Sequence, residues 1–270
     1  KSDEALKVIG SMQETFALSI SAAWIFNEKF VKEVFEDRLF NLHGTLLPKN
    51  RGGGGLSWQI LSKEPIGGCT LHKIDRGVDT GEIIAQKEFL FPPKCRIPKD
   101  YFQFHREEII EFLKDFFVKI KHQTIFFKAF GQSEALSSHW PRLNTPKQAW
   151  IDWSNKVDYL DRFICAFDDP YPGAQTFLEN KKLVLKKSVT SYSDGFFHPF
   201  QYGLVYRKND RWINIAVNGG TLIVQEVIDE KNQNIISKIK EGDRFHTPTE
   251  FINNKNDRVF YNSEGLKLKP

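Results

Sequence analysis

Two polar side chains with complementary chemistry stand two residues apart. Asn41 and His43 follow a short apolar run and precede a loop that reads GTLLPKNRGGGG. On a strand, residues two apart point to the same face. His43, with an ordinary pKa of about 6.5, suits a general base, and the Asn41 amide suits hydrogen bonding to the oxyanion that forms when a nucleophile attacks a carbonyl carbon. This pair predicts acyl transfer.

A third group is needed to orient the imidazole. Asp79, in the segment RGVDTGEI, is the best candidate because it follows another strand at its carboxyl end, where open α/β sheets bind ligands. We therefore predict that Asn41, His43 and Asp79 converge at that edge of the sheet. We also predict a cis Leu47–Pro48 bond, because the loop must turn sharply there and cis bonds are nearly confined to proline.

Each of these residues also has a structural interpretation. A lone histidine at a strand end is more often structural than catalytic, and Asp79 before Thr80 and Gly81 is also typical of a turn. The four glycines resemble a phosphate-binding loop, but no Gly-Lys-Ser/Thr sequence ends them, which argues against a P-loop. His72 alternates with core positions and is interpreted as structural.

The elements that must position these residues alternate between helix and strand. Helices are expected over 3–16, 27–35 (with Asn27 as N-cap), 56–62 and 101–127, and strands over 17–24, LFNLHG, 68–74 and 82–91. The apolar run at 17–24 is typical of a buried parallel sheet, and the long helix carries an apolar stripe. This pattern predicts an α/β domain closed by a helix.

The pattern changes after Gly131. A helix is expected at 157–167, followed by β-rich runs LVLKK, GLVYR, WINIAV and TLIVQEV, and Asn218-Gly219-Gly220 is a strong turn signal between the last two. We predict a catalytic domain at 1–130, a linker at 131–145, a mainly antiparallel β domain at 146–255 and a loose tail at 256–270.

Composition excludes several classes of protein. The chain has 270 residues, 40% of them hydrophobic, and a net charge of +4 without a concentrated basic face, which argues against a nucleic-acid partner. Its three scattered cysteines suit a reducing cytoplasm and neither a disulfide framework nor a zinc site, and no metal ligands are predicted. No apolar run approaches the ~20 residues of a membrane span. We expect a cytoplasmic protein.

Taken together, the motifs resemble a family. The segments NLHGTLLPKNRG and CTLHKIDRGVDTGEIIAQ resemble the N10-formyltetrahydrofolate-dependent formyltransferases, and IDWSNKVDYLDRFICAFDDPYPGAQTF resembles the second domain of the family's tRNA and sugar enzymes. The resemblance implies a Rossmann-like first domain. Family members usually begin with a strand-helix-strand half that this sequence lacks, so we expect the native protein to be longer.

The resemblance also implies ligands and residue roles. N10-formyltetrahydrofolate is the implied co-substrate, and Asn41, His43 and Asp79 are the implied catalytic set. The folate pterin is expected against two backbone segments, represented by Ala23, Trp24, Ile25, Phe26, Asp75, Gly77 and Val78. Trp24 is also open to interpretation as a buried core residue, and Arg51 is predicted to contact the substrate.

The segments LHGTLLPK and RGGGGLSW resemble the family's enzymes that act on nucleotide-linked amino sugars. This resemblance implies such a sugar as acceptor, for example a dTDP-amino-dideoxyhexose used for lipopolysaccharide O-antigen. A homodimer is expected. Two alternatives stay open: a methionyl-tRNA formyltransferase, and a non-catalytic sugar- or folate-binding module. The last would be favoured if the three catalytic candidates failed to converge.

Overall fold

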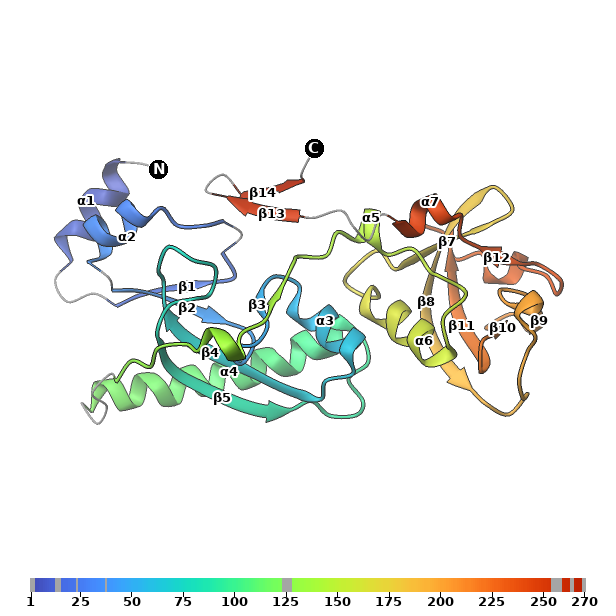
Figure 1. The fold of residues 1–270 in the computed structure, drawn as a ribbon, viewed down its shortest axis with the longest axis horizontal. Helices are drawn as coiled ribbons and strands as arrows, with labels where there is room; N and C mark the ends of the chain where they lie inside the picture. The colour runs from blue at the N-terminus through green and yellow to red at the C-terminus, as the bar shows by residue number, and fades with distance from the viewer. Residues whose placement is uncertain are drawn as a thin grey trace.

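The chain forms an α/β unit followed by a mainly antiparallel β unit, as the sequence predicts (Figure 1). The computed structural model describes residues 3–12, 16–22, 24–36, 38–122, 128–253, 259–262 and 265–268. Within those ranges, no helix is long and apolar enough to cross a membrane.

The first unit runs in chain order through α1 (Asp3–Ser11), β1 (Ala17–Ile20), α2 (Glu28–Phe35), β2 (Leu39–His43), β3 (Arg51–Gly52), α3 (Gly55–Ser62), β4 (Ile66–Lys73), β5 (Ile83–Leu90) and α4 (Pro98–Lys121). A connector follows, with η1 (Glu134–Leu136), β6 (His139–Trp140) and α5 (Thr145–Gln148). The second unit contains α6 (Val157–Ala166), β7 (Ala174–Leu178), β8 (Lys181–Ser191), η2 (Pro199–Gln201), β9 (Val205–Lys208), β10 (Ile213–Val217), β11 (Gly220–Ile228), η3 (Ile236–Lys238), β12 (Phe245–His246) and α7 (Thr249–Ile252).

The sheet of the first unit is mixed. Among the described residues its strand order is β1-β2-β4-β5, with β1 parallel to β2 and the other two pairs antiparallel. The expected parallel arrangement therefore holds only for β1 and β2. Because β4 runs antiparallel to β2, the carboxyl end of β4 lies beside the amino end of β2, away from His43. The strand-end argument that placed Asp79 beside His43 was wrong, and a loop brings Asp79 there instead.

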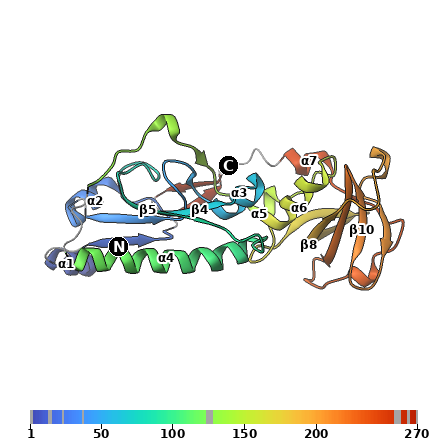
Figure 2. The same cartoon turned by 90° about the horizontal axis from the view of Figure 1, so that it is seen from below.

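Helix α4 covers one face of this sheet (Figure 2). Leu42 of β2 and Leu71 of β4 pack with Phe112 and Phe116 of α4, and all four are buried. Since strand residues alternate between faces, Leu42 facing the helix sends Asn41 and His43 to the opposite face. Because the apolar side chains of each strand face α4, the polar side chains lie on the opposite face of the sheet.

The second unit is built on an antiparallel sheet in the order β12-β7-β8-β11-β10-β9, counted within the described part of the chain. Helix α6 packs on it through Leu160 and Ile164, which join a buried aliphatic cluster. The hairpin of β10 and β11 turns at Asn218 and Gly219, and Gly219 has a φ of 83°, as the Asn-Gly-Gly signal predicts.

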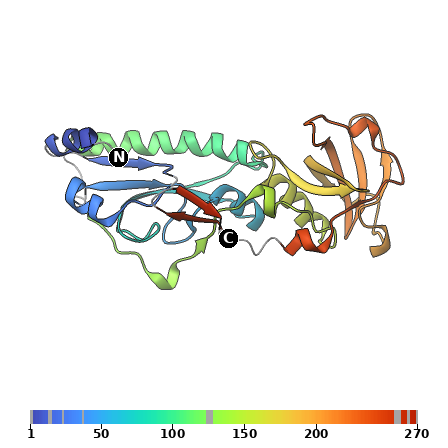
Figure 3. The same cartoon turned by 90° about the horizontal axis from the view of Figure 1, so that it is seen from above.

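Three element limits differ from expectation. Helix α1 ends at Ser11, β1 ends at Ile20, and α4 spans Pro98–Lys121; residues 123–127 of the expected helix lie outside the described residues. The segment predicted to be a loose tail contains the paired strands β13 (Val259–Asn262) and β14 (Gly265–Leu268), because Val-Phe-Tyr is a strong strand former despite the neighbouring lysines (Figure 3). The predicted domain limits stay a prediction.

Helix α3 joins the two units. The Ser57 hydroxyl donates to the Ala166 carbonyl of α6 at 2.8 Å, and Ile60 packs with Ala166 and Phe167. The α3 helix begins directly after the glycine-rich segment, so the second unit helps to fix that segment beside the first unit's sheet.

Candidate active site

Three polar side chains share the face of the sheet that α4 leaves open. Asn41 and His43 come from β2, and His72 of β4 pairs with Asn41 in the antiparallel register. Directly opposed residues in such a pair lie close enough for their side chains to interact. The Nδ2 of Asn41 lies 3.1 Å from the Nε2 of His72.

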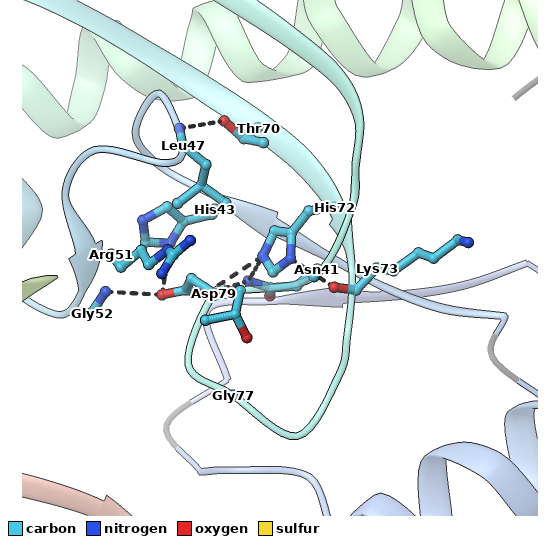
Figure 4. Close-up of polar contacts among 12 residues, drawn as sticks. Asn41, His43, Leu47, Arg51, Gly52, Thr70, His72, Lys73, Gly77 and Asp79 are labelled. Atoms are coloured by element: carbon cyan, nitrogen blue, oxygen red, sulfur yellow. Dashed lines mark hydrogen bonds and ion pairs between the residues drawn. The ribbon is translucent and has the colours of Figure 1, made fainter. Parts of the chain in front are cut away.

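Asp79 reaches this cluster from the loop after β4 (Figure 4). Its Oδ1 lies 3.4 Å from the Asn41 Nδ2, and its Oδ2 lies 3.5 Å from the His43 Nδ1. The backbone N–H of Gly52 donates to the same Oδ2 at 2.9 Å. The structure thus brings the three predicted catalytic residues together, while their catalytic role stays a prediction.

The imidazole of His43 is oriented by a backbone carbonyl. Its Nε2 lies 2.9 Å from the carbonyl oxygen of Asn50, which can only accept, so Nε2 carries the proton and donates. In the neutral ring this leaves Nδ1 as the basic nitrogen, facing Asp79. The expectation that Asp79 orients the ring therefore needs correction, because the hydrogen bond that holds the neutral ring is to Asn50, and the unprotonated Nδ1 cannot donate to Asp79.

The same surroundings tune the basicity of His43. Burial lowers the pKa of His43 from its ordinary 6.5, and the Asp79 charge and the Asn50 carbonyl partly offset this effect. The exposed fraction of the His43 side chain is only 12%. A neutral, base-competent imidazole is therefore favoured near neutral pH.

His72 belongs to the site, contrary to its structural interpretation. Its Nδ1 lies 2.7 Å from the Lys73 carbonyl oxygen and must donate to it, so the neutral ring presents Nε2 as an acceptor to Asn41. This fixes the amide of Asn41, whose two N–H groups point at His72 and Asp79. Alternation in the sequence places His72 on the face of its strand opposite the core positions, but only the antiparallel pairing of β2 and β4 sets it beside Asn41.

Asp79 is held as a carboxylate. Burial raises its pKa, but the hydrogen bond to His72, the charge of His43 and the Gly52 N–H together outweigh burial and bring the pKa down to about 2. The contribution of the His43 charge is complete only when that ring is protonated. Asp79 thus stabilises positive charge on a neighbouring imidazole.

These residues lie on the wall of a cavity of about 380 Å³, within the range of small-molecule sites. The predicted folate-contact residues that line it are Trp24, Ile25, Phe26, Asp75, Gly77 and Val78, while Ala23 lies outside the described residues. Trp24 is 48% exposed, so it is not a buried core tryptophan. The side chain of Asp75 accepts from Gly77 N and the Thr80 hydroxyl and shapes the loop itself.

Arg51 does not line this cavity, which corrects its predicted contact with substrate. It is 5% exposed, and its guanidinium donates to the side chains of Gln132 and Glu134. The following Gly52 has a φ of 95°, and a Cβ there would lie 2.3 Å from the carbonyl oxygen of Trp140. This glycine permits a close approach between β3 and the connector strand β6.

Two titratable lining residues, His105 and Arg142, were not singled out from the sequence. His105 of α4 is buried, and its Nε2 donates to the Gly68 carbonyl, while Arg142 comes from the connector. Only the packing of distant segments places them here.

The Leu47–Pro48 bond is cis, as predicted. Within the described part of the chain, His, Cys, Asp and Glu form no group able to hold a metal ion.

The chain belongs to the formyltransferase family. A family model described as Formyl transferase matches residues 4–99, and one described as Formyl transferase, C-terminal domain, matches residues 144–243. The fold and the two matches agree on the same two-unit organisation.

The similar proteins fall into more than one branch of this family. The methionyl-tRNA formyltransferase of Desulfotalea psychrophila is 31% identical over 190 residues, which are 70% of this chain and 56% of that protein. The bifunctional polymyxin resistance protein ArnA of Wigglesworthia glossinidia brevipalpis is 29% identical over 175 residues, 62% of this chain and 26% of that protein. The chain thus spans less than two thirds of these relatives.

Among solved structures, WlaRD, a sugar 3N-formyl transferase crystallised in the presence of dTDP and 5-N-formyl-THF, is 26% identical, with a TM-score of 0.59. The similarity covers 82% of this chain and 75% of that one. The family likeness therefore includes a sugar N-formyltransferase.

Proposed function

We propose that this protein transfers the formyl group of N10-formyltetrahydrofolate to the amine of a nucleotide-linked amino sugar. The observation that carries the proposal is the convergence of Asn41, His43 and Asp79 on the wall of a cavity that is also lined by the two predicted folate-contact segments. An amide donor, a neutral buried base and a carboxylate are the groups that acyl transfer to an amine requires.

The reaction begins when the uncharged amine attacks the formyl carbon. A new C–N bond forms, and the carbonyl oxygen gains the negative charge of a tetrahedral intermediate. The Asn41 N–H that points at Asp79 over 3.4 Å makes the weaker of that amide's two hydrogen bonds. It is the donor that can transfer to the oxyanion at least cost, while the bond to His72 keeps the amide oriented.

The proton of the attacking amine passes to Nδ1 of His43. The Nε2–H bond to the Asn50 carbonyl holds the ring, and the Asp79 carboxylate stabilises the imidazolium that results. The intermediate then collapses, the bond from the formyl carbon to N10 breaks, and the proton that His43 took from the amine passes to N10, which returns His43 to its neutral form. The products are the formamido sugar and tetrahydrofolate.

The choice of acceptor is supported by the likeness to WlaRD, whose structure was determined with dTDP and a formyl folate. A dTDP-linked amino-dideoxyhexose is the proposed substrate class, and its product would serve a cell-surface polysaccharide such as O-antigen. Methionyl-tRNA is the second candidate, because a methionyl-tRNA formyltransferase is 31% identical to this chain. The non-catalytic binding module loses its support, because the condition that would favour it, failure of the three residues to converge, is not met.

The experiment compares acceptors under one donor. The full-length protein is incubated with N10-formyltetrahydrofolate and, in parallel, a panel of nucleotide-linked 3-amino and 4-amino sugars or charged methionyl-tRNA. Mass spectrometry then detects the gain of one formyl group. We expect gain on an amino sugar; gain on methionyl-tRNA alone would select the second candidate, and no gain on any acceptor would refute formyl transfer. Cytoplasmic location and a homodimer stay predictions.

A further inference from the structure

We propose that Arg51 and Gln132 form a positioning unit that fixes Asp79 against His43. Neither residue lines the cavity through its side chain; both act through the loop that carries Asp79. The effect on turnover rests on the proposed formyl transfer, while the effect on His43 does not.

The first contact is between Arg51 and Gln132. The Nε and Nη2 atoms of Arg51 donate to the Gln132 Oε1 at 3.1 and 2.9 Å, and Nη1 and Nη2 donate to the two carboxylate oxygens of Glu134 at 3.0 and 2.9 Å. A guanidinium only donates, so the atom of Gln132 that faces it must be the carbonyl oxygen. Arg51 thereby fixes the orientation of the Gln132 amide, with its NH₂ group turned away.

That NH₂ group forms hydrogen bonds to the loop that carries Asp79. The Nε2 of Gln132 donates to the Asp79 carbonyl at 2.9 Å and to the Gly81 carbonyl at 2.7 Å. Asp79 has a φ of 55°. This left-handed region is energetically unfavourable for a residue that has a side chain. Such a conformation persists only where contacts impose it, and these two hydrogen bonds hold the backbone that directly follows the Asp79 Cα, from its own carbonyl to that of Gly81.

A second contact from the same strand acts on the carboxylate. Gly52, adjacent to Arg51 in β3, donates its N–H to the Asp79 Oδ2 at 2.9 Å. The strand β3 therefore holds Asp79 at its backbone through Gln132 and at its side chain directly. The buried Arg51 restrains this arrangement, because its guanidinium donates to the side chains of both Gln132 and Glu134 on the connector.

The position of Asp79 has a measurable consequence at His43. The groups that face the His43 imidazole are Asp79, His72, His105 and the Asn50 carbonyl. Among the charges, Asp79 raises the pKa of His43, whereas His72 lowers it. Loosening Asp79 must therefore lower the pKa of His43 further and remove stabilisation from its imidazolium form.

The test replaces Gln132 by methionine, which keeps the length of the side chain and removes its amide. The matched control is Gln175→Met, because Gln175 also donates through one Nε2 to two backbone carbonyls, those of Thr145 and Pro146 at 2.9 and 3.1 Å, but in the second unit. Each variant loses two hydrogen bonds from its own Nε2 to backbone carbonyls, and Gln132→Met also removes the Oε1 that accepts from Arg51. Four quantities are measured on each: the melting temperature, the pKa of His43 by NMR titration, and kcat and KM for formyl transfer.

We expect Gln132→Met to lower the pKa of His43 and to reduce kcat by roughly tenfold or more, with KM for the formyl donor changed by less than about twofold. Gln175→Met should lower the melting temperature and leave the pKa of His43, kcat and KM at the wild-type values. Arg51→Lys retains the charge but loses the fork that fixes the amide, and should move the pKa of His43 in the same direction by a smaller amount.

An unchanged pKa of His43 and an unchanged kcat in folded Gln132→Met would overturn the proposal and leave Gln132 a scaffold residue. If Gln132→Met does not fold, the same readouts on Arg51→Lys decide. If the wild-type protein transfers no formyl group to any acceptor, the proposed function fails, and the NMR titration still tests whether this unit positions Asp79.

Discussion

The Nε2 atom of His43 donates to the carbonyl oxygen of Asn50 at 2.9 Å, which leaves Nδ1 as the nitrogen that faces Asp79. The Asn50 carbonyl thus selects the tautomer of His43. The Asp79 carboxylate stabilises the imidazolium that forms when His43 accepts a proton. The consequences of this division of roles are open to measurement.

Replacing His43 by asparagine removes the base. We expect turnover per folded molecule to fall by about 10²-fold or more, the usual scale for losing general-base catalysis. The side chain is 12% exposed and hydrogen-bonded, so the fold should also lose about 1 kcal/mol. Melting curves and initial rates measure both effects; wild-type specific activity beside a lowered melting temperature would make His43 structural.

Replacing Asn41 by alanine removes the proposed oxyanion donor. We expect kcat to fall by ~10² to 10³-fold, with little change in the affinity for the formyl donor, because this hydrogen bond strengthens mainly in the transition state. Equilibrium binding of a stable folate and steady-state rates separate the two effects. A loss of folate affinity as large as the loss of kcat would instead assign Asn41 to binding.

The dependence of kcat/KM on pH should show a rising limb below pH 6.5, because burial lowers the pKa of His43 and the neutral imidazole is the active form. Asp79→Asn removes the charge that raises this pKa, so the limb should move to lower pH while the plateau rate falls. Rate profiles of the two proteins provide the test, and a limb displaced to higher pH would contradict the assigned interaction.

The free energy of unfolding should depend on the protonation of Asp79 at acid pH. The pKa of Asp79 is about 2 in the fold against an ordinary 3.8, so the unfolded chain binds its proton first as the pH falls. The stability that Asp79 contributes is complete above its unfolded pKa and is lost as the pH falls through about 2. Denaturant melts from pH 5 downward should show a smaller acid-induced loss for Asp79→Asn than for the wild type.

Gly52→Ala should be more damaging than an ordinary glycine substitution. A Cβ at Gly52 meets the Trp140 carbonyl oxygen at 2.3 Å with φ at 95°, so β3 must shift and carry the N–H away from Asp79. We expect a loss of about 1 to 3 kcal/mol in stability together with reduced kcat. Gly131→Ala is the control, since nothing lies within 4 Å of its Cβ. Equal effects of the two substitutions on stability and rate would refute the role of this close approach.

Local signals in the sequence were enough to predict several local elements, including one strand of the site. The Asn27 cap, the turn at Asn218 and Gly219, and the alternation of apolar and polar residues in β2 each appear in the structure as expected. Such features depend on neighbours within a few residues, so a pattern in the chain carries them.

The sequence by itself determined the α/β organisation, the face that carries Asn41 and His43, and the motifs that mark the family. Only the tertiary structure decided how Asp79 arrives, that His72 belongs to the site, and that Arg51 is directed into the connector. Strand direction, the path of a returning loop and the partner of a buried guanidinium depend on contacts between residues far apart in the chain. Packing selects among those contacts, and no local periodicity encodes the choice.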